Sequence, residues 1–200
     1  MAYRILKQLT DVFISAAGLI AIAPFWPFIA IAIKLNSSGP VLIKLDRISQ
    51  GRIIKIYKFR SMKDGAHFLK KNLAHLNERR DGPFFKIKND PRLTRTGKIL
   101  RKFRIDEFPQ LINVLKGELS LVGPRPHEPE EISLYPEEYK NLILAKAGVT
   151  GLSQVNGASS LPFLKEIEFD SYYVKNRSLG LDLKIILKTI LILFTDPTGV

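Results

Sequence analysis

The stretch VFISAAGLIAIAPFWPFIAIAI, residues 12–33, decides how the chain is organised. Its 22 residues carry no charge, and at about 1.5 Å per residue a helix of this length can cross a hydrocarbon core of about 30 Å. Pro24 and Pro27 interrupt the stretch. Because proline removes a backbone N–H and bends a helix, we expect the helix to break at Pro24. A bent helix can leave the bilayer on the side from which it entered.

The charges that flank this stretch bear on its topology. Arg4 and Lys7 precede it, and Lys34 begins a series of basic residues after it. Basic residues favour the cytoplasmic side of a membrane, so the charges on both flanks are accommodated best if both ends of the stretch stay cytoplasmic. A kinked helix that crosses the bilayer once is the main alternative, and a cleaved secretory signal is the other. We assign residues 1–36 to a membrane anchor and residues 37–200 to a globular domain continuous with it.

The composition limits the class of protein. Two hundred residues with 46% hydrophobic content suit one globular domain plus an anchor. The formal net charge of +12 indicates anionic partners, which include nucleic acid, a phospholipid surface and phosphorylated substrates. The chain has no cysteine, so it has neither a disulfide framework nor a thiol-based zinc site or nucleophile.

After the anchor, the pattern predicts an α/β domain that is mostly helical. Residues 41–46 and 52–59 have the composition of short strands, and residues 48–51 are expected to join them as a hairpin. Residues 64–95 are polar and only weakly periodic. Apolar spacing and helix breakers predict five helices, near residues 95–104, 107–116, 136–146, 163–177 and 181–194. The last helix is amphipathic, so it can pack on the core or lie at a membrane interface, and we favour core packing.

A second stretch, RKFRIDEFPQLINVLKGELSLVGPRPH at residues 101–127, carries the candidate chemistry. Two adjacent acids, Asp106 and Glu107, follow a cationic run and precede a rigid Gly-Pro-Arg-Pro turn. Such acids can divide two tasks, because one can attack an electrophile while the other holds a divalent cation and arginines neutralise phosphate oxygens. A structural interpretation is also open, since acids favour the first turn of a helix and Asp106 can serve as a cap.

The order of the motifs resembles that of the bacterial monotopic phosphoglycosyl transferases. The resemblance covers nearly the whole chain except roughly residues 64–95. It rests on the apolar segment with its proline and on four motifs: IYKFRSM (56–62), IDEFPQLINVLKGELSLVGPRP (105–126), AGVTGLSQVNG (147–157) and LDLKIILKTI (181–190). It implies a re-entrant helix-break-helix anchor joined to a compact cytoplasmic catalytic domain with a small β-hairpin. The serine that commonly precedes the breaking proline in that family is Ala23 in this chain.

The resemblance also implies a reaction, which initiates lipid-linked glycan assembly at the cytoplasmic face of the bacterial inner membrane. A sugar 1-phosphate passes from a UDP-sugar to a polyprenyl phosphate such as undecaprenyl phosphate, UMP is released, and an aspartyl phosphosugar forms on the way. Asp106 is the implied nucleophile, and the cationic run before it is expected to keep it ionised near neutral pH. A magnesium ion held by Glu107 and the diphosphate would offset the repulsion between negative groups.

Five further residues are implied to contact phosphate or substrate: Lys58, Arg101, Arg125, Gln154 and Asn156. Without the resemblance, an isolated strand lysine reads as a solvated edge residue, and a Gly-Pro-Arg-Pro segment reads as a turn connector. Two prolines on either side of Arg125 would hold that arginine in one direction. The roles of Gln154 and Asn156 in their polar loop stay open.

Two other classes of protein would also account for part of the sequence. A membrane-tethered nucleic-acid binder would explain the charge, but the sequence has no helix-turn-helix signature or aromatic RNA platform, so we expect no nucleic-acid partner. A non-catalytic adaptor on the membrane surface would explain the anchor and its attraction to phospholipids, but not the acid pair beside the rigid turn. The sugar, the glycan pathway and the oligomeric state are not encoded in any short motif.

Overall fold

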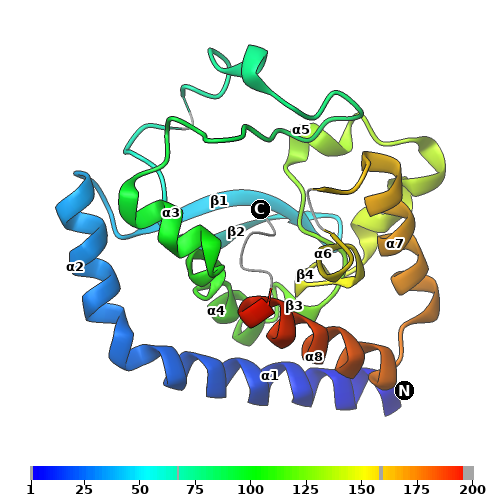
Figure 1. The fold of residues 1–200 in the computed structure, drawn as a ribbon. Helices are drawn as coiled ribbons and strands as arrows, with labels where there is room; N and C mark the ends of the chain where they lie inside the picture. Colours follow the sequence, from blue (N-terminus) through cyan, green and yellow to red (C-terminus); the bar gives the residue numbers. More distant parts are fainter. Residues whose placement is uncertain (1, 67, 158–159, 196–200) are drawn as a thin grey trace.

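The computed structural model describes residues 2–66, 68–157 and 160–195. Two helices lie along the base and one side of the molecule, and a β-hairpin crosses its middle (Figure 1). The elements follow in this order: α1 (Ala2–Ile22), η1 (Ala23–Phe25), α2 (Trp26–Asn36), β1 (Leu42–Ser49), β2 (Arg52–Phe59), η2 (Ala74–Leu76), α3 (Arg95–Lys102), η3 (Ile105–Glu107), α4 (Gln110–Leu115), β3 (Ser120–Val122), α5 (Pro129–Ile132), η4 (Glu137–Leu144), β4 (Gly148–Thr150), α6 (Leu152–Val155), α7 (Phe163–Asn176) and α8 (Leu179–Thr195).

The anchor segment forms a helix that breaks where the prolines predict. A single 3₁₀ turn, Ala23–Phe25, separates α1 from α2 and contains Pro24. In this turn the Trp26 N–H donates to the carbonyl of Ala23, and α2 leaves in a new direction (Figure 1). By length and composition alone, the 34-residue segment Tyr3–Asn36 could cross a membrane. The helix-break-helix prediction is therefore confirmed as local structure.

One side of this bent helix packs against the rest of the chain. Ile33 is buried, and the Trp26 ring meets the Phe59 ring edge-on with their centroids 4.9 Å apart. Asp11, the residue before the apolar stretch, is also buried and accepts a hydrogen bond of 3.1 Å from the Leu121 N–H. Because these contacts run from the middle of α1 into α2, the anchor and the domain share one packed interface.

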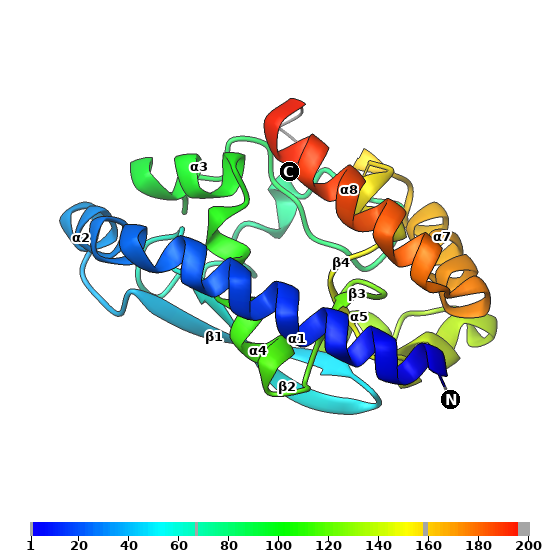
Figure 2. The ribbon, with the colours of Figure 1, turned by 90° about the horizontal axis from the view of Figure 1, so that it is seen from below.

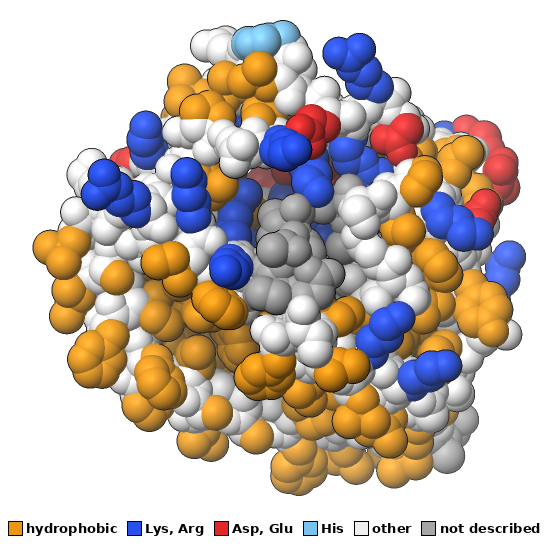
Figure 3. All heavy atoms as spheres, in the orientation of Figure 1, with side chains coloured by type: hydrophobic (Ala, Val, Ile, Leu, Met, Phe, Trp, Pro, Cys, Tyr) orange, Lys and Arg blue, Asp and Glu red, His pale blue; other side chains and the backbone are white. Residues whose placement is uncertain are grey.

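The opposite side of the bent helix is exposed and apolar. The first part of α1 comes close to α8 near the N-terminus (Figure 2), and hydrophobic side chains gather over the base of the molecule (Figure 3). We call this surface the apolar base. Its exposed side chains include Phe13, Ile20, Phe25, Phe28, Ile31, Leu183, Leu187, Leu191 and Phe194. The predicted core packing of the last helix is right for Ile185, which is buried, and wrong for the exposed leucines and Phe194.

The predicted hairpin is present, with a longer first strand and a shorter turn than expected. β1 and β2 pair antiparallel with Ser49 opposite Arg52, so only Gln50 and Gly51 form the loop. Both loop residues have positive φ angles, 53° and 69°. A two-residue turn of this type matches the twist of paired strands, which lets the ladder continue to Ser49.

A second pair of strands, β3 and β4, was not predicted. The two strands run parallel, with Ser120 opposite Gly148 and Val122 opposite Thr150. A Cβ atom added to Gly148 would lie 2.1 Å from the backbone nitrogen of Gly123. Since no side chain fits in that space, the glycines of two separate motifs allow their backbones to touch.

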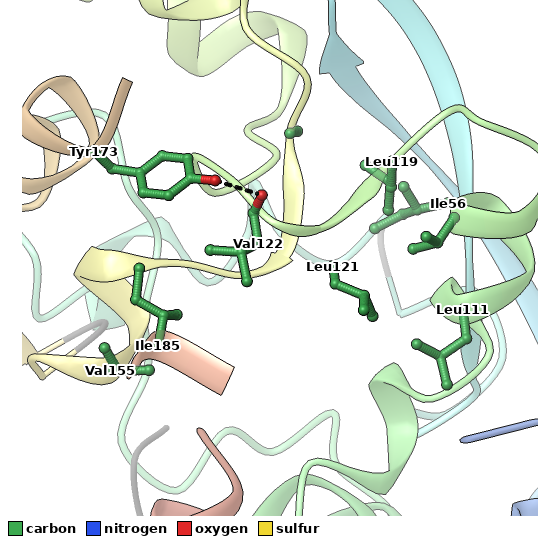
Figure 4. Close-up of a cluster of buried hydrophobic side chains, with 10 residues drawn as sticks. Ile56, Leu111, Leu119, Leu121, Val122, Val155, Tyr173 and Ile185 are labelled. Carbon is green, nitrogen blue, oxygen red and sulfur yellow. Dashed lines mark hydrogen bonds between the residues drawn. The ribbon is translucent and has the colours of Figure 1, made fainter. Parts of the chain in front are cut away.

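The main core lies between the hairpin, β3 and α8. Figure 4 shows Tyr173 of α7 directed at β3, where its hydroxyl donates to the Val122 carbonyl at 3.0 Å. The buried members of this core are Ile56, Leu111, Val114, Leu119, Leu121, Val122, Ala147, Val155, Tyr173 and Ile185. The core therefore joins strands that are more than sixty residues apart in the chain.

A smaller aromatic cluster fixes the segment that the sequence left undefined. Phe84 packs edge-on against Phe163 of α7 with their centroids 5.0 Å apart. The predicted helix near residues 136–146 occurs at the right place as a 3₁₀ helix, η4. Tyr139 and Leu142 of η4 pack on the same cluster. Their spacing of three residues suits a helix with three residues per turn.

Candidate active site

Asp106 and Glu107 lie in η3, the short turn between α3 and α4. Asp106 is buried, and the side chain of Glu107 is 29% exposed. Arg104, just before the turn, has a φ of 54°, which is a strained conformation for a residue with a Cβ atom. α4 begins after Pro109 without a side-chain cap. The alternative role of Asp106 as the cap of this helix is therefore wrong.

The hairpin brings Lys58 to the acid pair. The Lys58 Nζ atom lies 2.5 Å from the Glu107 Oε1 atom. Asn113 of α4 fixes this approach, because it accepts from the Tyr57 N–H at 3.0 Å and donates to the Lys55 carbonyl at 2.9 Å. The Asn113 side chain thus sets the register of α4 along β2, and Lys58 is the next residue of that strand.

The two acids experience opposite electrostatic effects. Burial works against ionisation of Glu107, but Lys58 and Arg125 outweigh it and lower the pKa of Glu107 to about 2. Burial raises the pKa of Asp106, with Glu107 adding to the effect and Lys58 and Arg101 opposing it. The sequence predicted that the cationic run would favour the charged form of Asp106. In the structure, desolvation outweighs that run, so the pKa of Asp106 shifts in the other direction.

The Gly-Pro-Arg-Pro turn and the 147–157 motif lie against each other. The Gly123 N–H donates to the Thr150 carbonyl at 2.9 Å, and the Gly148 N–H donates to the Pro124 carbonyl at 2.8 Å. Arg125 follows directly and has an exposed side chain. Its charge reaches Glu107, whose pKa it helps to lower. The parallel strand pair therefore presents an arginine near the acid pair.

A buried acid of α7 supports this turn from behind. Asp170 accepts a hydrogen bond from the Arg125 backbone N–H at 3.0 Å and another from the Ser153 hydroxyl at 2.7 Å. Burial raises the pKa of Asp170 to about 7, while the hydrogen bonds from Ser153 and Arg125 oppose the shift. Either protonation state offers an oxygen to the Arg125 N–H.

The other predicted residues occupy different positions. The Arg101 Nε atom donates to the Ser61 hydroxyl at 3.0 Å, and the charge of Arg101 acts on Asp106. Gln154 is buried in α6. The side-chain oxygen of Asn156 accepts a 2.7 Å hydrogen bond from Lys188 of α8. Asn156 thus links the polar loop to the last helix, and a contact with substrate stays a prediction.

Comparison with known proteins identifies the family. A family model described as bacterial sugar transferase matches residues 2–196. The chain belongs to the bacterial sugar transferase family.

Three of its relatives show the range of proteins in this family. An exopolysaccharide production protein, PSS, from Rhizobium leguminosarum bv. phaseoli is 39% identical, with 98% of each chain covered. An undecaprenyl-phosphate galactose phosphotransferase from Salmonella typhimurium is 38% identical over 93% of this chain and 40% of its own length. A UDP-glucose:undecaprenyl-phosphate glucose-1-phosphate transferase from Klebsiella pneumoniae is 39% identical over 93% of this chain and 39% of its own length. The chain thus spans about two fifths of the latter two.

The family resemblance implies a magnesium ion, and the acid pair is chemically suited to one. Magnesium favours oxygen ligands and is commonly bound by one or two carboxylates together with substrate phosphates and water. The low pKa of Glu107 keeps its carboxylate available as a donor at neutral pH. Among the residues that the structure describes, no three His, Cys, Asp or Glu side chains form a closed metal cluster. A metal at Glu107 would therefore take part of its ligands from the substrate.

Two residues of the site were missed by the sequence analysis. Asn113 lies inside a quoted motif, but no pattern showed that its amide bonds the backbone of β2. Asp170 lies on the amphipathic helix α7, where an acidic side chain is usually expected to face solvent. A signal was present, because the apolar spacing of α7 would have placed Asp170 on the same face as Phe163, Ile167 and Tyr173.

Proposed function

We propose that the protein transfers a sugar 1-phosphate from a UDP-sugar to a polyprenyl phosphate and so initiates assembly of a bacterial glycan. The observation that carries this proposal is the acid pair itself, with Asp106 buried and Glu107 held by Lys58. The names of the galactose and glucose phosphotransferases among its relatives support the same reaction class. The apolar base provides a surface that can contact the membrane in which a lipid acceptor is held.

The first chemical step is attack by Asp106. A carboxylate oxygen of Asp106 forms a bond to the sugar-bearing phosphorus, and the bond between that phosphorus and the bridging oxygen of the diphosphate breaks. UMP leaves with the electron pair of that bond, and the sugar phosphate remains on Asp106. Burial leaves this carboxylate poorly solvated, which favours its use as a nucleophile once Lys58 and Arg101 have stabilised its charge.

In the second step the acceptor removes the phosphosugar. A phosphate oxygen of the polyprenyl phosphate attacks the same phosphorus, and the bond to Asp106 breaks. The products are a polyprenyl diphosphate sugar and a free carboxylate, so the enzyme is regenerated. Glu107 would hold a magnesium ion that neutralises the diphosphate. Arg125, carried by its rigid turn, would contact a phosphate oxygen directly.

The proposed setting is the cytoplasmic face of the bacterial inner membrane. We infer that the helix enters the bilayer, bends at Pro24 and returns, because the bend, the basic flanks and the exposed apolar base all fit this topology. The chain has no cysteine, so single cysteines at Ala2 and Ser38 can report the topology. Both should react with a membrane-impermeant thiol reagent only in inverted vesicles. Reaction of the Ala2 cysteine in intact cells would establish a transmembrane helix instead.

The reaction itself is tested by UMP release. The full chain in detergent or nanodiscs is mixed with magnesium, a polyprenyl phosphate and each member of a panel of UDP-hexoses and UDP-N-acetylhexosamines. We expect UMP release with at least one sugar and a matching polyprenyl diphosphate sugar. The Asp106→Asn variant is the matched control. Absence of UMP with every sugar, from protein that is folded and membrane-bound, would refute the proposed function and favour a non-catalytic adaptor.

A further inference from the structure

The turn that carries Arg125 has few backbone N–H groups that can fix it to the rest of the protein. Pro124 and Pro126 lack a backbone N–H, so the Gly-Pro-Arg-Pro segment contains only two backbone donors. The N–H of Gly123 is used by β4, where it donates to the Thr150 carbonyl. The N–H of Arg125 donates to Asp170 at 3.0 Å. Beyond the end of β3, the turn is therefore held by the Pro124 carbonyl, which accepts from the Gly148 N–H, and by one backbone donor, which is anchored on a single carboxylate.

Asp170 is itself held in place on its other side. Its second oxygen accepts from the Ser153 hydroxyl at 2.7 Å, and the same hydroxyl lies 3.1 Å from the side-chain oxygen of Gln154. Only 2% of Asp170 is exposed. A buried acid with a partner for each oxygen has a fixed direction, and α7 supplies a rigid support for it.

We propose that Asp170 is a positioning residue that directs the Arg125 guanidinium toward the phosphates bound at the acid pair. Asp170 does not touch the substrate in this scheme, because it acts through the backbone of the turn. The inference rests on the proposed function for its kinetic consequence, although the hydrogen bond itself is independent of it. A displacement of about 1 Å at a phosphate contact is enough to lower the rate strongly.

Two substitutions separate positioning from charge. Asp170→Asn keeps the shape and an oxygen for the Arg125 N–H, while its NH₂ group can donate to the Ser153 hydroxyl. Asp170→Leu has a similar size and offers no acceptor. We expect Asp170→Asn to stay within about threefold of the wild-type kcat/KM, and Asp170→Leu to lose roughly tenfold or more.

A double-mutant cycle with Arg125→Ala tests whether the loss acts through the guanidinium. Alanine removes the guanidinium but retains the backbone N–H, so the hydrogen bond to Asp170 can still form. In the Arg125→Ala background, Asp170→Leu should cost at most about threefold, since most of the effect is already lost. An equal loss in both backgrounds, or an Asp170→Asn variant as impaired as Asp170→Leu, would overturn the proposal.

Hydrogen exchange provides a readout that needs no turnover. A peptide over residues 123–127 reports few amides because two of its residues are prolines. Its exchange should be faster in Asp170→Leu than in the wild type and unchanged in Asp170→Asn. Unchanged exchange in Asp170→Leu would refute the positioning role even if the enzyme is active. Failure of the wild type to release UMP would instead refute the proposed function, and the exchange result would still decide whether Asp170 holds the turn.

Discussion

Replacing Asn113 should destabilise the protein more than replacing Lys116, an exposed residue that hydrogen-bonds to the same strand. Asn113 is fully buried and makes three side-chain hydrogen bonds. It accepts from the Tyr57 N–H and donates to the Lys55 carbonyl, and it also donates to the Glu118 carboxylate at 2.6 Å. The first two partners are backbone groups of β2, which carries Lys58 toward the acid pair.

Asn113→Leu keeps the approximate size of the side chain and removes all three bonds. The Tyr57 N–H and the Lys55 carbonyl, whose bonds to Asn113 are partly buried, then lose their partner, at a cost of about 1–3 kcal/mol for each group that water does not reach. Glu118 is only partly buried, so water can replace its bond. The expected loss is about 3 kcal/mol after the gain from the added apolar surface. For a chain of this size, that loss lowers the unfolding midpoint by roughly 6–12 °C.

The assay is thermal unfolding of the purified full chain in one fixed detergent, followed by circular dichroism. Lys116→Ala is the matched control, because Lys116 also contacts β2 through the Tyr57 hydroxyl, at 2.8 Å, but is exposed. That variant should lose less than about 1 kcal/mol, since water can replace an exposed hydrogen bond. If Asn113→Leu unfolds within about 3 °C of the wild type, the register argument for α4 and β2 is wrong.

Three further predictions concern the acids. Asp106→Asn should abolish turnover and the phosphosugar adduct seen by intact-protein mass spectrometry, with an unfolding midpoint no lower than that of the wild type; an adduct in this variant would exclude Asp106 as nucleophile. Glu107→Gln should impair turnover severely, and excess chelator should stop the wild type; full activity in chelator would refute the magnesium assignment. Because the folded-state pKa of Asp170 is raised to about 7, its contribution to stability is present at low pH and is lost as pH rises from about 4 to 7. Asp170→Asn should therefore gain up to about 1.4 kcal/mol per pH unit relative to the wild type across this range, and denaturant unfolding at pH 5 and pH 7 tests the sign.

The features predicted best from the sequence are those with a local cause. Pro24 breaks the helix because proline alters its own turn, whatever lies around it. The hairpin follows from two strand-like segments with Gln50 and Gly51 between them. The parallel pair of β3 and β4 has no such cause. Each strand has three residues, and their pairing depends on two glycines from separate motifs that allow close backbone contact.

The residues of the candidate site also fall into those that the sequence indicates and those that only the structure reveals. Asp106, Glu107, Lys58 and Arg125 could be named because they lie in motifs that resemble a family pattern. Asp170 could not, because its partner Arg125 lies 45 residues away in the chain, and a lone acid on a helix usually faces solvent. Burial, which a sequence shows only indirectly, also reversed the expected direction of the Asp106 pKa shift.

The direction of the Asp106 pKa shift matters for the roles that are proposed for the two acids, which are nucleophilic attack and metal binding. Lys58 and Arg125 lower the pKa of Glu107, which favours its charged form and so suits the proposed binding of a cation. Asp106 has its pKa raised by burial, which makes its carboxylate the more basic of the two and hence the stronger nucleophile. Adjacent acids whose environments push their pKa values apart are suited to different roles. These opposite shifts agree with the proposed roles, in which Asp106 attacks the phosphorus and Glu107 holds the metal.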